Sequence, residues 1–524
     1  MSARRDLVPA ALTALLGFGI LALRPVLPVD ETRYLEVFRE SLAGNPLLLR
    51  LCGEPYAEKP PLLFWLARLL SELGLPPALA LRSVPVLATA LCVYFAARVG
   101  RRAGLELAGW MQAALLLPLL AGQLLIFDPL LACALWGAVL AWTSGRERVF
   151  TLATAAALLA KGPVAYLFLV PFLWSAAPLR TGPAAGRGLR RTLVLSALAL
   201  VPLAAWALAA ARIGGPEFAR ALLWDRWAGR VVDSFAHRRA LWFYAPVLLV
   251  GALPATMVLL RRPSSHVRGS ELWARRLAWS VAGLVAAFTL FSGKQAHYMV
   301  PLAPALALLA ARALERPGSS PARLALGVRI QLGCLALFLG AAAFGLGALD
   351  ELPAITGPVG LAFVAHGARL TLLAGAAGAA LGLAWTLRER ASPTGLLATA
   401  ALGSGVALLA LHATAGRLFY PHALATALAA EPERPMAFLG TSHQGLVELL
   451  AAPRRLDKVD DQGALLAWAA AHPEGLLWVD PDKLESELPA EFELVTEDVV
   501  HRSAVRLLRP RAPRTASTTG LRRP

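Results

Sequence analysis

The chain has 524 residues, of which 57% are hydrophobic and only 16% are charged, and its formal net charge is +17. A soluble protein carries roughly a quarter charged residues, so this composition excludes an ordinary soluble globular protein. The positive charge does not indicate nucleic-acid binding, because the surplus of Lys and Arg lies in short loops between apolar runs. We therefore expect an α-helical polytopic membrane protein that binds membrane lipids and no nucleic acid.

The first apolar run, residues 7–27, follows a short basic N-terminus. It is longer than the hydrophobic region of a signal peptide, and no A-x-A-like cleavage site precedes Asp30. These features predict a first spanning helix whose N-terminus lies in the cytoplasm.

Many further apolar runs follow, and together they predict about thirteen spans within a membrane domain of residues 1–412. The fifth and sixth runs are short and meet at Lys161, Gly162 and Pro163, which indicates helices that are tilted, or broken around a cavity. The expected runs after the first lie near residues 78–98, 106–123, 127–143, 149–161, 163–178, 192–212, 241–260, 277–291, 298–312, 325–347, 360–386 and 395–412.

Arginine-rich loops alternate with loops that hold few cations, and the positive-inside rule places the arginine-rich set in the cytoplasm. Residues 28–78, Asp128, Lys161, 213–240 and 292–298 are then expected on the outer face. The arginine-rich loops lie at residues 98–102, 146–148, 180–191, 261–276, 312–323 and 388–390.

The chain changes character near residue 413, and we expect a small extracytoplasmic α/β domain over residues 413–509. Two short apolar segments are typical of buried strands, and two later segments are expected to form a closing hairpin. The basic tail, 510–524, is expected to be disordered. The strand candidates are 435–441 and 475–480, the helix candidates are 445–451 and 461–471, and the hairpin segments read FELVTEDVV and SAVRLL.

Residues 28–78 form the first outer loop and gather ionisable groups on a chain that otherwise avoids them. Asp30 starts a pattern in which Tyr34, Phe38 and Leu42 share one face of an interfacial helix. Asp30 is therefore either a simple helix cap or a carboxylate with a chemical role.

Lys59 precedes Pro60 and Pro61, which suit the first turn of a helix that continues to about Leu73. A cation beside the positive end of a helix is unfavourable unless an anion also binds there, and a phosphate is the natural occupant. The alternative is an interfacial lysine whose ammonium extends to water.

Four further segments carry isolated polar groups on the expected outer face. Asp128 has only apolar neighbours, so it is either a functional carboxylate or a helix cap. Lys161 is a lone cation at a helix break and is a candidate for binding a phosphate oxygen. His237 is either an ordinary loop residue or, together with Glu58, a ligand of a metal.

The segment FSGKQAHYMVP places Lys294, His297 and Tyr298 at the outer end of an expected span. One lysine at such a position is ordinary. A lysine, a histidine and a tyrosine within five residues indicate a site for a lipid head group.

These segments resemble the aminoarabinose transferase (ArnT-like) branch of the GT-C glycosyltransferases, of which the protein O-mannosyltransferases are relatives. The resemblance covers roughly residues 20–310. The matching motifs are DETRY, GEPYAEKPPLLFW, AKGP, H-x-x-x-LWFYAP and FSGK-x-x-HY.

The resemblance implies the GT-C fold and a transferase that uses a polyprenyl-phosphate sugar as its donor. It implies no nucleotide or redox cofactor, and a divalent metal cation as a possible requirement. The implied roles are a catalytic set of Asp30, Asp128 and Glu31, a donor-phosphate set of Arg33, Tyr56, Lys59, Lys161 and Lys294, and a metal pair of Glu58 and His237.

We therefore expect the enzyme to move a sugar, with inversion, to an acceptor on the outer face of a bacterial-type inner membrane. The acceptor is a lipid A-like glycolipid, a glycan or a protein, and the last would make the chain a protein O-mannosyltransferase. The alternative from another class is a non-catalytic carrier, or flippase, for polyprenyl-linked sugars. A carrier should show polar residues at mid-membrane or internal repeats, and the sequence shows neither.

Overall fold

The structure is a computed structural model of the whole chain. It describes residues 2–24, 26, 30–51, 53–180, 188–225, 239–260, 272–316, 319–349, 360–387, 392–419, 422–439, 456–481, 484, 492–500 and 503–511. The chain divides into two compact units, each of which is discontinuous in sequence. The first comprises Met1–Pro25 and Phe38–Leu418, and the second comprises Val26–Val37 and Phe419–Pro524.

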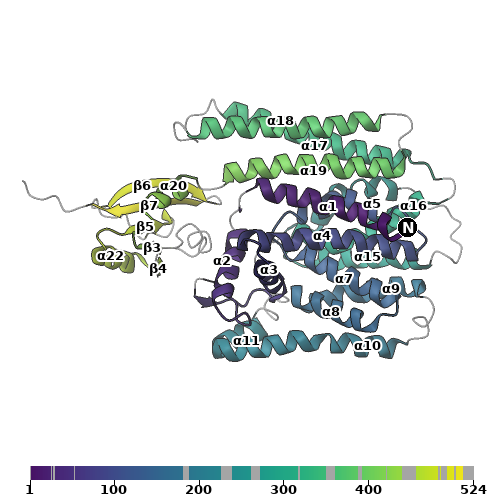
Figure 1. Ribbon diagram of the computed structural model, residues 1–524, viewed down its shortest axis with the longest axis horizontal. Coiled ribbons are helices and arrows are strands. Elements are labelled where there is room, and N and C mark those ends of the chain that lie inside the picture. The colour runs from purple at the N-terminus through teal and green to yellow at the C-terminus, as the bar shows by residue number, and fades with distance from the viewer. Residues whose placement is uncertain are drawn as a thin grey trace, which may run out of the picture. The chain divides into compact units, whose positions relative to one another are not determined.

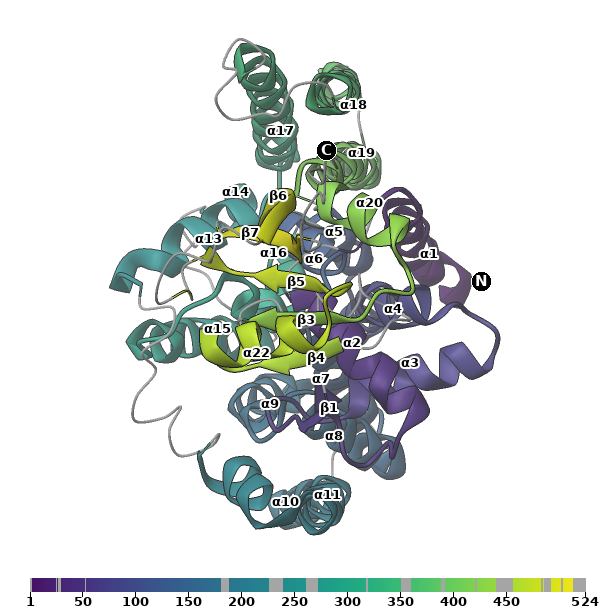
Figure 2. The ribbon, with the colours of Figure 1, turned by 90° about the vertical axis from the view of Figure 1, so that its left-hand side faces the viewer.

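The first unit is built of helices, most of which run along one common direction (Figure 1). The second view shows several of them end-on, with α17, α18 and α19 as neighbours (Figure 2). The elements before residue 180 are α1 (Ser2–Leu23), α2 (Asp30–Ala43, shared with the second unit), β1 (Arg50–Leu51), β2 (Glu54–Pro55), α3 (Leu62–Glu72), α4 (Pro77–Arg102), α5 (Ala108–Ala114), α6 (Leu116–Ala121), α7 (Asp128–Thr143), α8 (Glu147–Lys161), α9 (Val164–Ala176) and η1 (Ala177–Leu179).

The second half of this unit continues in the same way. Its elements are α10 (Leu189–Leu198), α11 (Leu200–Arg220), η3 (Ala221–Asp225), η4 (Leu241–Phe243), α13 (Tyr244–Gly251), α14 (Ala255–Leu259), α15 (Leu272–Leu290), η6 (Ala296–Leu302), α16 (Ala303–Leu314), α17 (Ala322–Leu349), α18 (Gly360–Thr386) and α19 (Pro393–Phe419).

Within the described part of the chain, seven helical segments are long and apolar enough to cross a membrane. They identify a multi-pass membrane protein and confirm the predicted fold class. Three shorter apolar helices, at Asp128–Thr143, Val164–Leu179 and Leu241–Gly251, accompany them. The count of thirteen spans stays a prediction.

Several apolar runs that the sequence predicts as single spans are broken helices. The run at 106–123 forms α5 and α6, because Leu115 is extended (φ −67°, ψ 130°) between them. The backbone N–H of Leu116, which this break frees, donates to the Leu253 carbonyl at 3.3 Å. The run at 241–260 likewise forms η4, α13 and α14. Breaks of this kind are tolerated in a membrane where neighbouring protein satisfies the freed backbone groups.

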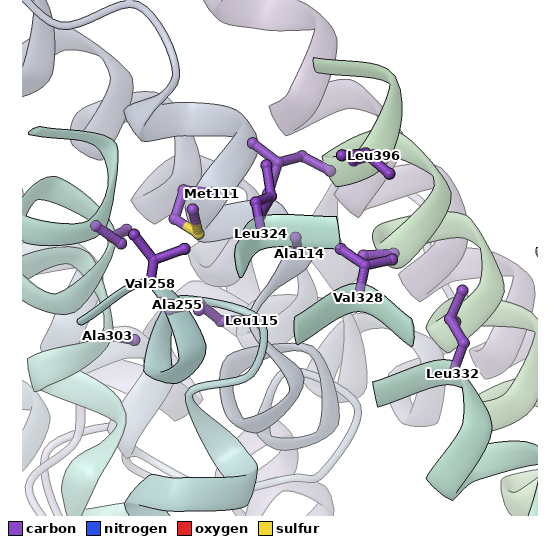
Figure 3. Close-up of a cluster of buried hydrophobic side chains, with 14 residues drawn as sticks. Met111, Ala114, Leu115, Ala255, Val258, Ala303, Leu324, Val328, Leu332 and Leu396 are labelled. Carbon is purple, nitrogen blue, oxygen red and sulfur yellow. The ribbon is translucent and has the colours of Figure 1, made fainter. Parts of the chain in front are cut away.

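A core of small and branched apolar side chains holds α5, α14, α16, α17 and α19 together (Figure 3). On α16 the contributing residues are Ala303, Ala307 and Ala310, which recur at helical spacing. Small side chains let helices approach closely, which is the usual basis of packing between helices in lipid. Gly375 on α18 shows the same principle, since a Cβ placed there would lie 2.4 Å from the Cβ of Ala410 on α19.

The arginine-rich ends of several helices lie together at one end of the first unit. The contacts that join them are Arg101 Nε to Asp6 Oδ1 (3.0 Å), Arg102 Nη2 to the Thr143 carbonyl (2.7 Å), Arg191 Nη2 to Glu147 Oε2 (2.8 Å) and the Arg180 guanidinium over the Trp142 ring (4.3 Å). They connect the start of α1, the end of α4, the turn between α7 and α8, and the start of α10. The opposite ends of α7 and α8 carry Asp128 and Lys161, so the two groups of residues lie at opposite ends of this hairpin.

The second unit contains a mixed five-stranded sheet with the strand order β4-β3-β5-β7-β6. The β3, β4 and β5 strands are parallel, and the β6–β7 hairpin adds to β5 antiparallel with an irregularity between Leu494 and Thr496. The elements are α20 (His422–Ala430), β3 (Met436–Leu439), β4 (Leu456–Val459), α22 (Gln462–Ala471), β5 (Leu476–Val479), β6 (Phe492–Val500) and β7 (Ser503–Pro510).

Helices α20 and α22 cover opposite faces of this sheet. Met436 and Phe438 pack with Leu428 of α20, whereas Ala437 and Leu439 pack with Leu465 of α22. This alternation follows from the two-residue period of a strand that is buried on both faces. The expected strands at 435–441 and 475–480, the helix at 461–471 and the closing hairpin are confirmed. The sequence analysis missed β4, and the candidate helix 445–451 lies outside the described residues. Of the predicted disordered tail, 510–524, the first residue ends β7, and residues 512–524 lie outside the described part of the chain.

Candidate active site

The hairpin of α7 and α8 brings Asp128 and Lys161 together. Asp128 is the first residue of α7 and Lys161 is the last residue of α8, and only residues 144–146 separate the two helices. An antiparallel pair of similar length places the start of one helix beside the end of the other. The Lys161 ammonium lies 2.6 Å from Asp128 Oδ1.

Gly162 ends α8 directly after this lysine. It has a φ of 74° and a ψ of −163°, a conformation that residues with a Cβ rarely adopt. Its N–H still donates to the Leu158 carbonyl, so the helix stays regular up to Lys161. The A-K-G-P segment therefore forms the predicted break between two helices.

Asp128 is almost fully buried, with 3% of its side chain exposed. The negative charge lies in the first turn of its helix, where the helix dipole stabilises it. Within the described residues, its carboxylate contacts are side chains of other elements and not backbone N–H groups of α7. This geometry favours a functional carboxylate over a helix cap.

The η6 segment brings two further groups to Asp128. His297 Nε2 lies 3.6 Å from Asp128 Oδ2, and the Lys161 ammonium lies 4.6 Å from the centre of the Tyr298 ring. The rings of His297 and Tyr298 meet edge to face, with 5.0 Å between their centres. A hydrogen bond of 3.1 Å from the Trp136 indole to the Pro301 carbonyl fastens η6 to α7.

Lys59 lies at the same end of α7. Its ammonium is 5.6 Å from the centre of the ring of Phe127, the residue before Asp128. Phe64, on the helix that follows Lys59, meets the same ring edge-on at 6.1 Å. The described structure thus places two lysines, Lys59 and Lys161, beside the start of α7.

Tyr56 and Glu58 lie close together in the same loop. The Tyr56 hydroxyl donates to Glu58 Oε2 at 3.3 Å, and the Tyr56 side chain is buried. Glu58 is one of the two predicted metal ligands, and the other, His237, lies outside the described residues. Across the residues that the structure describes, no three His, Cys, Asp or Glu side chains form a metal-binding group.

Lys294 is buried, and its ammonium binds two backbone carbonyls. It donates to Phe291 at 2.6 Å and to Arg239 at 3.2 Å. These contacts join the segment before η4 to the loop before η6. Lys294 therefore connects two loops near the site. Its predicted role in binding the donor phosphate stays a prediction.

Asp30, Glu31 and Arg33 belong to the segment of α2 that forms part of the second unit. Asp30 Oδ1 and Arg33 Nη2 are 2.5 Å apart, and 61% of the Asp30 side chain is exposed. The Arg33 guanidinium also lies 5.1 Å from the centre of the Tyr34 ring. Glu31 is buried, so the accessible carboxylate of this helix end is Asp30.

The sequence analysis missed Tyr244, which is buried at the start of α13, a helix that packs against η6. Its segment, LWFYAP, belongs to one of the matching motifs. An aromatic residue at the start of an apolar helix is, however, typical of a membrane interface, so its type alone gives no signal of function.

The described groups bring cationic donors together with a buried carboxylate. The ammonium of Lys161 lies beside Asp128 and the Tyr298 ring, His297 faces the other Asp128 oxygen, and Lys59 lies over the neighbouring Phe127 ring. An ammonium has three donors, so Lys161 can bind Asp128 and a ligand oxygen at the same time. Asp128 in turn fixes where that ammonium lies, which is the arrangement that favours stabilisation of a developing negative charge.

The chain is similar in sequence to undecaprenyl phosphate-alpha-4-amino-4-deoxy-L-arabinose arabinosyl transferases. It is 32% identical to arabinosyl transferase 1 of Sodalis glossinidius over 302 aligned residues, and the alignment covers 54% of each chain. It is 32% identical over 379 residues to that of Pseudomonas aeruginosa, which covers 64% of each chain. The chain thus spans about half to two thirds of the length of these curated relatives. No family model matches the chain.

The fold is similar to that of ArnT from Cupriavidus metallidurans. The apo structure of that protein superposes with a TM-score of 0.70 and 19% sequence identity, over 96% of this chain and 97% of the other. The structure bound to undecaprenyl phosphate gives a TM-score of 0.69 with 20% identity. These likenesses confirm the resemblance that the sequence motifs predict and show that the fold extends over both units.

Proposed function

We propose that this protein is an integral membrane glycosyltransferase that takes a sugar from a polyprenyl-phosphate donor. The observation that carries the proposal is the buried Asp128 carboxylate between Lys161 and His297, at the end of the α7–α8 hairpin away from the arginines. An ionisable cluster in a membrane bundle is costly and usually functional. The similarity to arabinosyl transferases gives the same chemistry, with undecaprenyl phosphate-aminoarabinose as the donor.

In the proposed mechanism the lysines bind the donor phosphate. Lys59 and Lys161 flank the start of α7, and Arg33 is the third cation assigned to this role. As the bond between sugar and phosphate breaks, negative charge grows on the phosphate, and fixed cations lower the energy of that state. Removing one such group typically costs about 10²–10³ in rate.

Asp30 is the proposed general base. It removes a proton from the acceptor while the acceptor oxygen attacks the sugar, which contributes about 10²–10⁴ in rate. The leaving group is already a phosphate, so it needs no proton from an acid. One displacement with inversion of the sugar is then the simplest sequence of steps.

We assign the site to the outer face of a bacterial-type inner membrane, with the N-terminus in the cytoplasm. The support is the separation of the arginine-rich helix ends from Asp128 and Lys161, combined with the positive-inside rule. The proposed acceptor is a lipid A-like glycolipid. The C-terminal unit then also lies outside the cytoplasm.

The test is transfer by the purified full-length protein. The protein is incubated with undecaprenyl phosphate-4-amino-4-deoxy-L-arabinose and lipid A, and the mass of the lipid A is measured. We expect a mass increase of one aminoarabinose unit, and Lys59→Met should lose it. Lys458→Met, which removes a partly exposed lysine of the C-terminal unit, is the matched control and should retain activity.

Two results would contradict the proposal. If the protein moves the donor across the membrane of vesicles and no glycosylated product forms, the protein is a carrier instead. Equal transfer by the wild type and Lys59→Met would remove this lysine from the donor site. If a protein or glycan gains the sugar and lipid A does not, the reaction class stands and the proposed acceptor is wrong.

A further inference from the structure

Tyr244 carries a buried hydroxyl that the mechanism above does not use. Its side chain is 1% exposed, and the hydroxyl has no hydrogen-bond partner within the described part of the chain. A buried hydroxyl without a partner destabilises the folded state, so almost all such groups in proteins bind protein or water. An exception beside a candidate active site indicates a partner that arrives with the substrate.

Helix α13, which Tyr244 begins, packs against η6, the segment that carries His297 and Tyr298 of the candidate site. The backbone N–H of Gln295, the residue before η6, lies near the phenolic oxygen. That N–H is itself a donor, so it leaves the hydroxyl proton of Tyr244 without an acceptor.

The surrounding chain holds this tyrosine in place. Lys294 donates to the carbonyls of Arg239 and Phe291, and so joins the segment that leads into η4 and α13 to the loop before η6. Phe243 packs edge-on against the ring at 5.3 Å. Because the ring is held before any ligand binds, the phenolic oxygen has a fixed position, and its proton can turn towards an acceptor that arrives there.

We propose that the Tyr244 hydroxyl donates a hydrogen bond to an oxygen of the donor phosphate. The inference rests on the proposed function. Asp128 does not act as its acceptor in this structure, since the Tyr244 hydroxyl makes no hydrogen bond within the described residues and the Asp128 oxygens face Lys161 and His297. An anionic phosphate oxygen drawn in by Lys161 is a stronger acceptor than a neutral group, and hydrogen bonds to it are short and strong.

The experiment compares the wild type with Tyr244→Phe, which keeps the ring and removes the hydroxyl alone. Two quantities are measured on the full chain in detergent: the Kd for undecaprenyl phosphate and the melting temperature of the ligand-free protein. We expect Kd to rise about tenfold to a hundredfold, the usual effect of losing a hydrogen bond to a charged group. The melting temperature should stay the same or rise, because the lost hydroxyl had no partner.

Tyr166→Phe is the matched control. The Tyr166 hydroxyl, on α9, donates to the Ser196 carbonyl at 2.5 Å, so it is a hydroxyl with a structural partner. Its removal should lower the melting temperature and leave Kd unchanged. Undecaprenol, which has the same chain without the phosphate, should bind equally to the wild type and to Tyr244→Phe.

Each contrary result overturns the inference. An unchanged Kd for undecaprenyl phosphate in Tyr244→Phe overturns it while the proposed function stands. So does a melting temperature that falls as in Tyr166→Phe, since the hydroxyl would then have a structural partner. An equal loss of affinity for undecaprenol would show that the phosphate is not the acceptor. If the wild type itself fails to bind undecaprenyl phosphate, both the inference and the proposed function fall.

Discussion

Asp128 and Lys161 are opposite charges at opposite ends of their helices, and their charged atoms lie 2.6 Å apart. Asp128 begins α7, where the helix dipole favours an anion, and Lys161 ends α8, where it favours a cation. Both helix ends therefore stabilise the pair in addition to the direct attraction. This arrangement keeps a charged pair in a bundle whose other buried side chains are mostly apolar.

The first prediction concerns the stability of this pair. Asp128→Asn leaves the Lys161 ammonium without its carboxylate, and Lys161→Met leaves the carboxylate without its lysine. Each single variant should lower the free energy of unfolding by up to about 3 kcal/mol, because one charge is left without its partner. The double variant should lose less free energy of unfolding than the two single variants lose together. It should nevertheless be inactive. Thermal melting and the transfer assay measure the two effects.

An exposed ion pair provides the control for this double-mutant cycle. Arg506 and Glu497 pair across β6 and β7 with about half of each side chain exposed, so their coupling should be near 0–1 kcal/mol. If the losses of Asp128→Asn and Lys161→Met simply add, the two groups do not act as a pair.

The second prediction separates the folding of α2 from its chemistry. Asp30 is mostly exposed and its pair with Arg33 is a surface pair, so Asp30→Asn should melt within a degree or two of the wild type. Its transfer rate should fall about 10²–10⁴-fold if Asp30 is the base. Glu40→Gln is the control, since Glu40 lies on the same helix and accepts from the Gly53 N–H. Transfer by Asp30→Asn at the wild-type rate would exclude Asp30 as the base.

The third prediction tests whether Lys294 is needed for the fold or for the ligand. Lys294→Met removes two hydrogen bonds from a buried ammonium and should lower the free energy of unfolding by about 1–3 kcal/mol. If Lys294 acts only on the fold, any rise in the Kd for undecaprenyl phosphate should result from disorder of the two loops that it joins. A variant as stable as the wild type, but unable to bind undecaprenyl phosphate, would instead make Lys294 a direct phosphate ligand.

The fourth prediction addresses the divalent cation. If Glu58 and His237 bind a metal, the purified protein should contain a divalent cation by elemental analysis, and both Glu58→Gln and His237→Ala should lower that content. His472→Ala is the control, because His472 stacks on Trp468 in the C-terminal unit. Equal metal content in all four proteins would exclude this pair as the binding site.

The sequence predicted helices and strands best where hydrophobicity alone determines which of them forms. Runs of apolar residues predict helices in a membrane protein because lipid leaves the backbone no other partner. The short, continuous apolar run at Met436–Leu439 predicts a strand buried on both faces. Apolar content could not reveal the breaks at Leu115 or between α13 and α14, since hydrophobicity does not distinguish a straight helix from a broken one whose backbone groups find partners elsewhere.

For the candidate site, the sequence by itself identified the residue types, because charged groups are rare and costly in a membrane chain. Only the tertiary structure showed which of them meet. Asp128 pairs with Lys161 because an antiparallel hairpin returns the chain to its starting end, and Lys294 binds backbone carbonyls, which have no signature in a sequence. Tyr244 could not be identified from the sequence for a related reason. The role proposed for it rests on a buried hydroxyl without a hydrogen-bond partner in the described structure, and packing in three dimensions decides whether a hydroxyl has a partner.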